Sequence, residues 1–158
     1  MARLCDCSVA KIEENRFGAA RDFAVAYNTT VLLKGNRTLI ADPQGNVYVN
    51  MSGNSALAKG GSGDVLAGVI GSLLAQGYDA VTAARLGAYI HGSAAEILTE
   101  NGNSEASVLP SDLPRVIGRF RRNEYAQIFC ACIAFCNVFD GMCENIGCRK
   151  QTSCGLSV

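Results

Sequence analysis

The feature that most constrains this chain is a glycine-rich hexapeptide, Lys-Gly-Gly-Ser-Gly-Asp at positions 59–64, which runs directly into an apolar helical pattern. Glycines let backbone amides converge without obstruction by Cβ atoms, and the first turn of a helix offers unpaired N–H groups at the positive end of its dipole. We therefore predict a phosphate-binding loop formed by Gly60, Gly61, Ser62 and Gly63. The loop lacks the Gly-Lys-Ser/Thr ending of a Walker loop and the glycine spacing of the dinucleotide fingerprint.

Asp64 closes this loop, and a carboxylate at a helix N-terminus stays ionised. Beside a bound phosphate it can accept the proton of a substrate hydroxyl and so create the nucleophile for phosphoryl transfer. The alternative is an ordinary helix N-cap, for which Asp is a favoured residue. Three glycines and a serine in front of a long apolar helix favour the anion-binding interpretation.

A second candidate site follows residues 29–33, which are β-branched and then fully apolar and predict a strand covered on both faces. Two cations and a hydroxyl stand where that strand ends, and ligands of α/β sheets bind at strand ends. A solvated turn explains the same spacing equally well. The candidate residues are Lys34, Gly35, Asn36, Arg37 and Thr38.

Hydrophobic periodicity predicts the other elements. We expect a helix over 8–27, a hairpin formed by 38–41 and 47–49, and helices over about 65–77 and 79–98. One buried face of the first helix is predicted to carry Phe17, Ala20, Phe23, Ala24 and Tyr27. Gly68 and Gly71 lie inside the predicted helix over about 65–77 and suggest that another element packs close to the backbone of this helix.

Charge and hydropathy exclude some partners. Fourteen basic residues balance fourteen acidic ones, so no overall positive field favours nucleic acid or an anionic membrane. No run approaches the roughly 18 uninterrupted apolar residues of a spanning helix, and no basic-then-apolar leader opens the sequence. We therefore expect a cytoplasmic protein with neither nucleic-acid nor membrane partners.

The cysteines and the histidine are weaker candidates. A disulfide framework would staple the whole fold, whereas the eight cysteines lie only at the two ends, so we expect reduced thiols. They form no Cys-x-x-Cys pair and have no histidine nearby, which makes structural or accidental thiols the better interpretation than zinc. His91, without a partner acid or thiol at ligand spacing, is predicted to be a packed or capping side chain.

Residues 54–68, Asn-Ser-Ala-Leu-Ala-Lys-Gly-Gly-Ser-Gly-Asp-Val-Leu-Ala-Gly, resemble the ATP/ADP-dependent NAD(P)H-hydrate dehydratases of the ribokinase-like superfamily. Leu-Ala-Gln-Gly at 74–77 and the stretch 34–43 add to the resemblance, which extends from Met1 to about Arg121. It implies an α/β, ribokinase-like fold: a partial three-layer αβα domain over 1–122. A Cys-rich tail, 123–158, has no counterpart in the family.

The resemblance implies a hydro-lyase of metabolite repair. Such enzymes use ADP or ATP with Mg²⁺ to phosphorylate the ring hydroxyl of NADHX or NADPHX; phosphate then leaves, and NAD(P)H is restored. Carried onto this sequence, Asp64 would be the base, Gly63 would contact the nucleotide through its backbone, and 34–38 would bind its phosphates. The family also implies a homo-oligomer and a functional link to an NAD(P)HX epimerase.

One departure from the family concerns the start of the chain. In the family a His-Pro-Gly-Glu segment, which helps to hold the hydrated nicotinamide, directly precedes the stretch that resembles Met1 to Leu4. We therefore expect the N-terminal half of the sheet and most of the substrate pocket to be missing. A half-sheet exposes an unpaired edge, which predicts poor solubility or self-association. Two alternatives stay open: a small-molecule kinase of the thiazole or hydroxymethylpyrimidine type, and an inactive chain that still binds a nucleotide.

Overall fold

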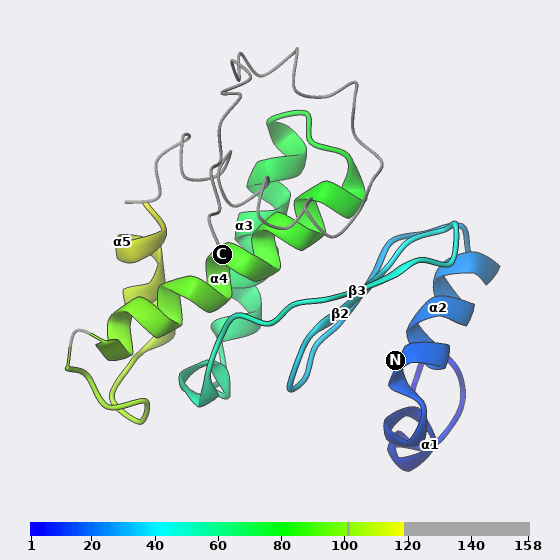
Figure 1. Cartoon of the computed structure of the whole chain (residues 1–158), viewed down its shortest axis with the longest axis horizontal. Coiled ribbons are helices and arrows are strands. Elements are labelled where there is room, and N and C mark those ends of the chain that lie inside the picture. Colours follow the sequence, from blue (N-terminus) through cyan, green and yellow to red (C-terminus); the bar gives the residue numbers. More distant parts are fainter. Residues whose placement is uncertain (101, 119–158) are drawn as a thin grey trace, which may run out of the picture. The chain divides into compact units, whose positions relative to one another are not determined.

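The computed structural model describes residues 1–100 and 102–118 (Figure 1). The predicted boundary between 122 and 123, and the six cysteines beyond it, lie outside these residues. The helices are α1 (Val9–Glu14), α2 (Arg16–Ala26), α3 (Ser62–Ala75), α4 (Ala80–Glu100) and α5 (Leu113–Ile117), the strands are β1 (Val31–Leu33), β2 (Leu39–Ala41) and β3 (Val47–Val49), and two short 3-10 helices, η1 and η2, cover Ser55–Leu57 and Pro110–Asp112.

The strands form one antiparallel sheet in the order β1-β2-β3. Val31 pairs with Ala41, and Ala41 pairs with Val47, so each strand follows its neighbour through a short connection. The predicted hairpin is confirmed: its turn is closed by Asp42, whose Oδ1 accepts hydrogen bonds from the backbone N–H groups of Gln44 and Asn46 at 3.0 and 2.8 Å.

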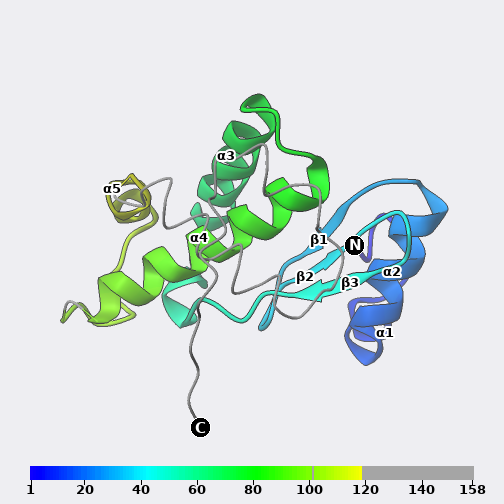
Figure 2. The same ribbon diagram turned by 45° about the horizontal axis from the view of Figure 1, so that its top comes forward.

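Helices cover both faces of this sheet (Figures 1 and 2), which confirms the predicted three-layer α/β arrangement for the described residues. Successive strand residues point to opposite faces, so a continuous apolar run supplies two cores. On the α2 face, Val31 and Ala41 pack with Ala20 and Ala24. On the α4 face the core cluster consists of Ile40, Ala84 and Ala88, with Leu32 and Tyr48 packed against it.

The predicted N-terminal helix is divided at Asn15, which caps α2 by accepting a hydrogen bond from the Gly18 N–H at 2.9 Å. The predicted apolar face is only partly correct. Ala20 and Ala24 are fully buried, whereas Phe17 and Tyr27 are 54% and 65% exposed. Ala20 and Ala24 occupy the buried face because their small side chains let the backbone of α2 approach the sheet closely.

The predictions for α3 and α4 are confirmed in type, with bounds shifted by one to three residues: α3 begins at Ser62, so that Ser62 and Gly63 of the predicted loop belong to its first turn. Asp79 caps α4, its Oδ1 accepting a hydrogen bond from the Thr82 N–H at 3.0 Å. None of the described helices is both long and apolar enough to span a bilayer. The predicted close packing of another element against Gly68 and Gly71 is wrong. A Cβ atom added at either glycine would meet no described residue within 4 Å.

This open space makes a stability prediction at Gly71. Because glycine in a helix interior costs about 1 kcal/mol relative to alanine, Gly71→Ala is expected to raise the free energy of unfolding by about 0.5–1 kcal/mol. Urea denaturation followed by circular dichroism measures the change. A destabilised variant would contradict the prediction and show that something packs against this face of α3.

Candidate functional site

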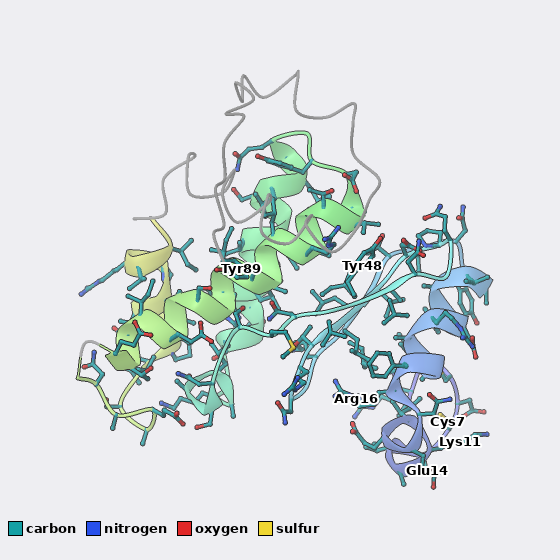
Figure 3. All side chains as sticks on the ribbon, in the orientation of Figure 1. Cys7, Lys11, Glu14, Arg16, Tyr48 and Tyr89 are labelled. Atoms are coloured by element: carbon teal, nitrogen blue, oxygen red, sulfur yellow. The ribbon has the colours of Figure 1, made fainter. Side chains whose placement is uncertain are left out.

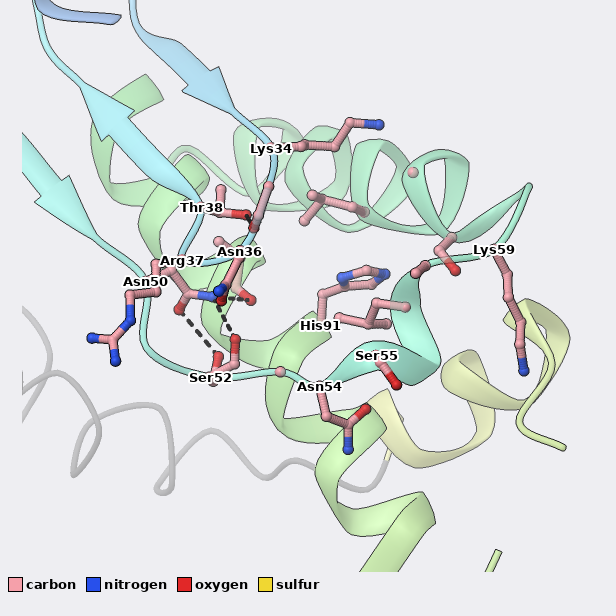
Figure 4. A pocket seen from close by; sticks show the side chains of 18 residues that line it. Lys34, Asn36, Arg37, Thr38, Asn50, Ser52, Asn54, Ser55, Lys59 and His91 are labelled. Carbon is pink, nitrogen blue, oxygen red and sulfur yellow. Dashed lines mark hydrogen bonds between the residues drawn. The ribbon is translucent and has the colours of Figure 1, made fainter. Parts of the chain in front are cut away.

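A cavity of about 640 Å³ brings the two predicted segments together (Figure 4). One side is the turn between β1 and β2, and the other is the N-terminus of α3, with the segment 50–59 and α4 completing the wall. The predicted site residues that line it are Lys34, Gly35, Asn36, Arg37, Thr38, Ser62 and Gly63. The remaining three, Gly60, Gly61 and Asp64, do not line the cavity but stand beside residues that do.

The N-terminus of α3 is open, as an anion site requires. Its N-cap is Gly61, which has a φ of 92° and provides no side-chain cap. Within the described residues, the N–H groups of Gly60, Gly61 and Gly63 make no hydrogen bond. Asp64 is therefore not the N-cap: it is an exposed residue of the first helical turn. Free amides at a helix N-terminus attract anions.

Lys34 reaches this helix end from the opposite segment. A Cβ atom added at Gly63 would lie 2.6 Å from Lys34 Nζ. The absence of a side chain at position 63 thus leaves room for the ammonium group beside the free amides. A cation and a helix N-terminus that meet in one cavity form a site for a phosphate group.

Arg16 supports the turn that carries Lys34. Its Nη1 donates a hydrogen bond to the Asn36 carbonyl at 2.8 Å, and its Nη2 donates one to the Lys34 carbonyl at 3.4 Å. Figure 3 shows Arg16 at the beginning of α2. Sequence reasoning missed this residue because its partners are backbone carbonyls about 20 positions away, which no local pattern reveals.

The wall of the cavity between residues 50 and 54 is fastened to α4. Asn50 Nδ2 donates to the Ala88 carbonyl at 3.4 Å, and Ser52 Oγ donates to the Tyr89 carbonyl at 3.1 Å. The Gly53 N–H donates to Glu96 Oε1 at 2.7 Å. The segment that sequence alone shows only as small and polar is thus ordered by hydrogen bonds to a helix far along the chain.

Lys59 turns its ammonium group away from the cavity, toward a loop before η2 (Figure 4). Nζ donates to the Glu105 and Ala106 carbonyls at 2.9 and 2.8 Å and also to the Val108 carbonyl. Lys59 therefore has a structural role: its hydrogen bonds connect the glycine loop to residues 105–108.

Replacing Lys59 tests this structural role. Lys59→Met keeps most of the stem but leaves three carbonyls without their charged donor, so the free energy of unfolding should fall by about 2–3 kcal/mol. Lys11→Met, on an exposed residue of α1, is the control and should change stability by less than about 0.5 kcal/mol. Urea denaturation compares them, and equal stabilities of the two variants would contradict the assignment.

Two buried polar atoms at the cavity, Ser62 Oγ and His91 Nε2, have no hydrogen-bond partner among residues 1–100 and 102–118. His91 is buried, as predicted, but it also lines the cavity, which sequence reasoning did not foresee. Burial lowers the pKa of His91 below its ordinary value of 6.5; the Ser62 backbone beside the imidazole acts against this shift, and the positive charge of Lys34 adds to it. The imidazole is thus neutral at physiological pH.

Potential metal ligands do not cluster in the part of the chain that is described: no group of three or more His, Cys, Asp or Glu side chains is placed to hold an ion. Cys5 and Cys7 are free thiols. The candidate site of these residues is the polar cavity.

Comparisons with known proteins agree on one family. A family model described as NAD(P)H-hydrate dehydratase matches residues 1–119. The ADP-dependent (S)-NAD(P)H-hydrate dehydratase of Neisseria meningitidis is 46% identical over 126 residues, which are 80% of this chain and 42% of the relative. The Bacillus subtilis enzyme of the same name is 38% identical over 121 residues, 75% of this chain and 44% of the relative.

The fold agrees as well. A crystal structure of ADP/ATP-dependent NAD(P)H-hydrate dehydratase from Bacillus subtilis, co-crystallised with ATP/Mg²⁺, superimposes with a TM-score of 0.68 at 37% identity and is matched over 76% of this chain and 44% of that chain. The chain thus spans less than half the length of these relatives.

Proposed function

The chain belongs to the NAD(P)H-hydrate dehydratase family, with its ribokinase-like fold, and from that premise we propose that it binds ADP or ATP in the polar cavity and uses the nucleotide to dehydrate NADHX and NADPHX. The observation that carries the proposal is the meeting of the Lys34–Thr38 turn with the open N-terminus of α3. The two segments form one phosphate site although they are remote in sequence.

The residues present fit a nucleotide phosphate. Free amides of the glycine loop, the Lys34 ammonium group and the orphaned Ser62 hydroxyl are all donors toward anionic oxygen. Gly35, Asn36, Arg37 and Thr38 would hold the nucleotide along the turn. Mg²⁺ would arrive with the nucleotide, because this ion is held largely by phosphate oxygens and water.

Asp64 would act on the second substrate. Its carboxylate is exposed beside the cavity and has no hydrogen bond or ion pair among the described residues. It is thus free to take the proton of the ring hydroxyl as that oxygen attacks phosphorus. Hydroxide leaves poorly and phosphate leaves well, so the consumption of one phosphoryl group makes the elimination feasible.

Restoration of NADH absorbance tests the function directly. The chain is mixed with NADHX, Mg²⁺ and ADP or ATP, and we expect the absorbance of the reduced nicotinamide to return together with free phosphate. A stable phosphorylated product in place of free phosphate would favour the kinase alternative. Nucleotide binding without turnover would leave only the inactive nucleotide-binding chain, and the absence of both would overturn the proposal.

Lys34 provides a separate test of nucleotide binding. Lys34→Ala should weaken ADP binding by about tenfold to a hundredfold, the loss of one charge-assisted contact worth about 1.5–3 kcal/mol. Adenosine, which has no phosphate, should bind the variant and the parent equally. Calorimetric titration measures both ligands, with Lys11→Ala as the matched control. An unchanged ADP affinity would remove Lys34 from the phosphate site.

Further proposals concern the cellular setting. The names of several relatives, "bifunctional NAD(P)H-hydrate repair enzyme", support a functional link between this chain and an NAD(P)HX epimerase. A homo-oligomer and a cytoplasmic location complete the proposal. Size-exclusion chromatography with light scattering tests the oligomer, and a monodisperse monomer would contradict it.

A further inference from the structure

Ser62 and His91 place two unsatisfied polar atoms at one end of the cavity. The residues are only 4% and 6% exposed, and neither Ser62 Oγ nor His91 Nε2 has a hydrogen-bond partner in the described part of the chain. An unpaired buried polar group costs about 1–3 kcal/mol, and native proteins seldom leave one without a reason. Both residues line the cavity, so a bound ligand is placed to provide the missing partners.

The surroundings specify the charge of that ligand. Ser62 is the first residue of α3, directly between Gly61 and Gly63, whose N–H groups are free. Lys34 Nζ lies beside Gly63, and its positive charge lowers the pKa of His91. Figure 4 shows the imidazole between the Lys34–Thr38 turn and the segment that carries Ser52 to Ser55. The imidazole thus stands among donors and a cation, an environment that selects an anionic oxygen.

We propose that His91 is a phosphate-binding residue: Nε2 takes up a proton from solvent when the nucleotide binds and donates a hydrogen bond to a phosphate oxygen. The inference rests on the proposed binding of ADP or ATP in this cavity. It assigns a ligand contact to a residue that sequence reasoning placed only in the core.

Each element around His91 has a defined charge. The β1–β2 turn contributes Lys34, and Arg37 of the same turn donates to Met51 Sδ at 3.2 Å. On α4 itself, the Glu96 carboxylate is engaged by the Gly53 N–H. Lys59 is held by the carbonyls of 105–108, and Asp64 of α3 lies outside the lining. Arg37 and Glu96 keep their charges in these contacts, and among the charged groups named here Lys34 is the one that shifts the pKa of His91.

A bound phosphate reverses this balance. In the free protein, burial and Lys34 hold the imidazole neutral and its pKa low. A phosphate placed between them neutralises Lys34 and pairs with the imidazolium, which raises the pKa of His91. Binding is then coupled to proton uptake. Nucleotide affinity rises as the pH falls from the pKa of the complex toward the lower pKa of the free protein, and it is constant outside that window.

The only histidine of the chain gives a signal that needs no assignment. Nuclear magnetic resonance follows its imidazole Cε1–H across pH, without ligand and with saturating ADP. We expect the pKa to rise by about 1–3 units with ADP and to stay unchanged with adenosine. If ADP binds and the pKa does not move, His91 is a packing residue and the inference fails. If ADP does not bind, the proposed function fails instead.

His91→Gln provides the second test, because glutamine keeps a hydrogen-bond donor but cannot take up a proton. In the parent, ADP affinity should be about tenfold tighter near pH 6 than near pH 8, beyond the ionisation of ADP itself. The variant should retain only the ionisation of ADP. Equal pH profiles would overturn the inference. Circular dichroism checks that the variant folds. If the variant does not fold, the NMR titration of the parent tests on its own whether His91 binds the phosphate.

Discussion

Asp64→Asn is expected to reduce the proposed turnover of NAD(P)H hydrate by a factor of about 10²–10⁴, the usual contribution of a general base. The amide has nearly the shape of the carboxylate but cannot accept the proton of the ring hydroxyl. Asp64 is exposed on the first turn of α3 and does not line the polar cavity. The affinity for ADP should therefore change by less than about threefold, so that the loss falls on kcat.

A matched control separates this loss from a general effect of charge. Asp22→Asn removes one acid from α2, where Asp22 pairs with Arg21 at the surface, and should leave turnover unchanged. Turnover and calorimetric titration are measured on the same preparations. Activity of Asp64→Asn close to that of the parent would remove Asp64 from the proposed chemistry, whereas lost ADP binding would make it a binding residue.

Gly92→Ala is expected to lower the free energy of unfolding by about 2–3 kcal/mol, the upper part of the range for overpacked interiors. A Cβ atom at this position would lie 2.6 Å from the Ser52 carbonyl carbon and 2.7 Å from its oxygen. These are backbone atoms, so no side-chain rotation relieves the contact. Since Ser52 is fastened to α4 by its hydrogen bond to the Tyr89 carbonyl, the wall of the cavity must move.

Gly71→Ala is the control for this variant, because it makes the same substitution in a helix where the added atom meets no described residue. The two variants should change stability in opposite directions in urea denaturation. Gly92→Ala should also weaken ADP binding, since Ser52 and Gly53 line the cavity. An unchanged free energy of unfolding for Gly92→Ala would mean that the segment 50–54 can move away from α4 without loss of stability.

The parts of the fold that follow from local physics were predictable from sequence. The α3 and α4 helices have clear periodicity and end signals, and the hairpin has the turn-rich connector that a reversal of the chain requires. The division of the N-terminal helix at Asn15 was missed, because an asparagine inside a helical pattern is also compatible with a continuous helix. The exposure of Phe17 was missed because buried small residues were enough to form the α2 contact.

The candidate site was predictable only where its residues form a contiguous sequence motif. The glycine loop and the Lys34–Thr38 turn could each be proposed, and the cavity brings them together. The contacts of Arg16, Lys59 and His91 could not be predicted, because the partners of each residue lie far along the chain. A single histidine carries no sequence pattern, and only the structure shows that it lines the cavity.

The order of the strands has a thermodynamic consequence. Because β1, β2 and β3 are consecutive and joined by short turns, their pairing closes small loops at a low cost in chain entropy. The cavity, in contrast, needs residues from 34 to 91 to meet, so it is completed only when α4 docks on the sheet. A nucleotide that binds only the completed cavity would therefore stabilise the folded chain relative to the unfolded one, by an amount that grows with the nucleotide concentration.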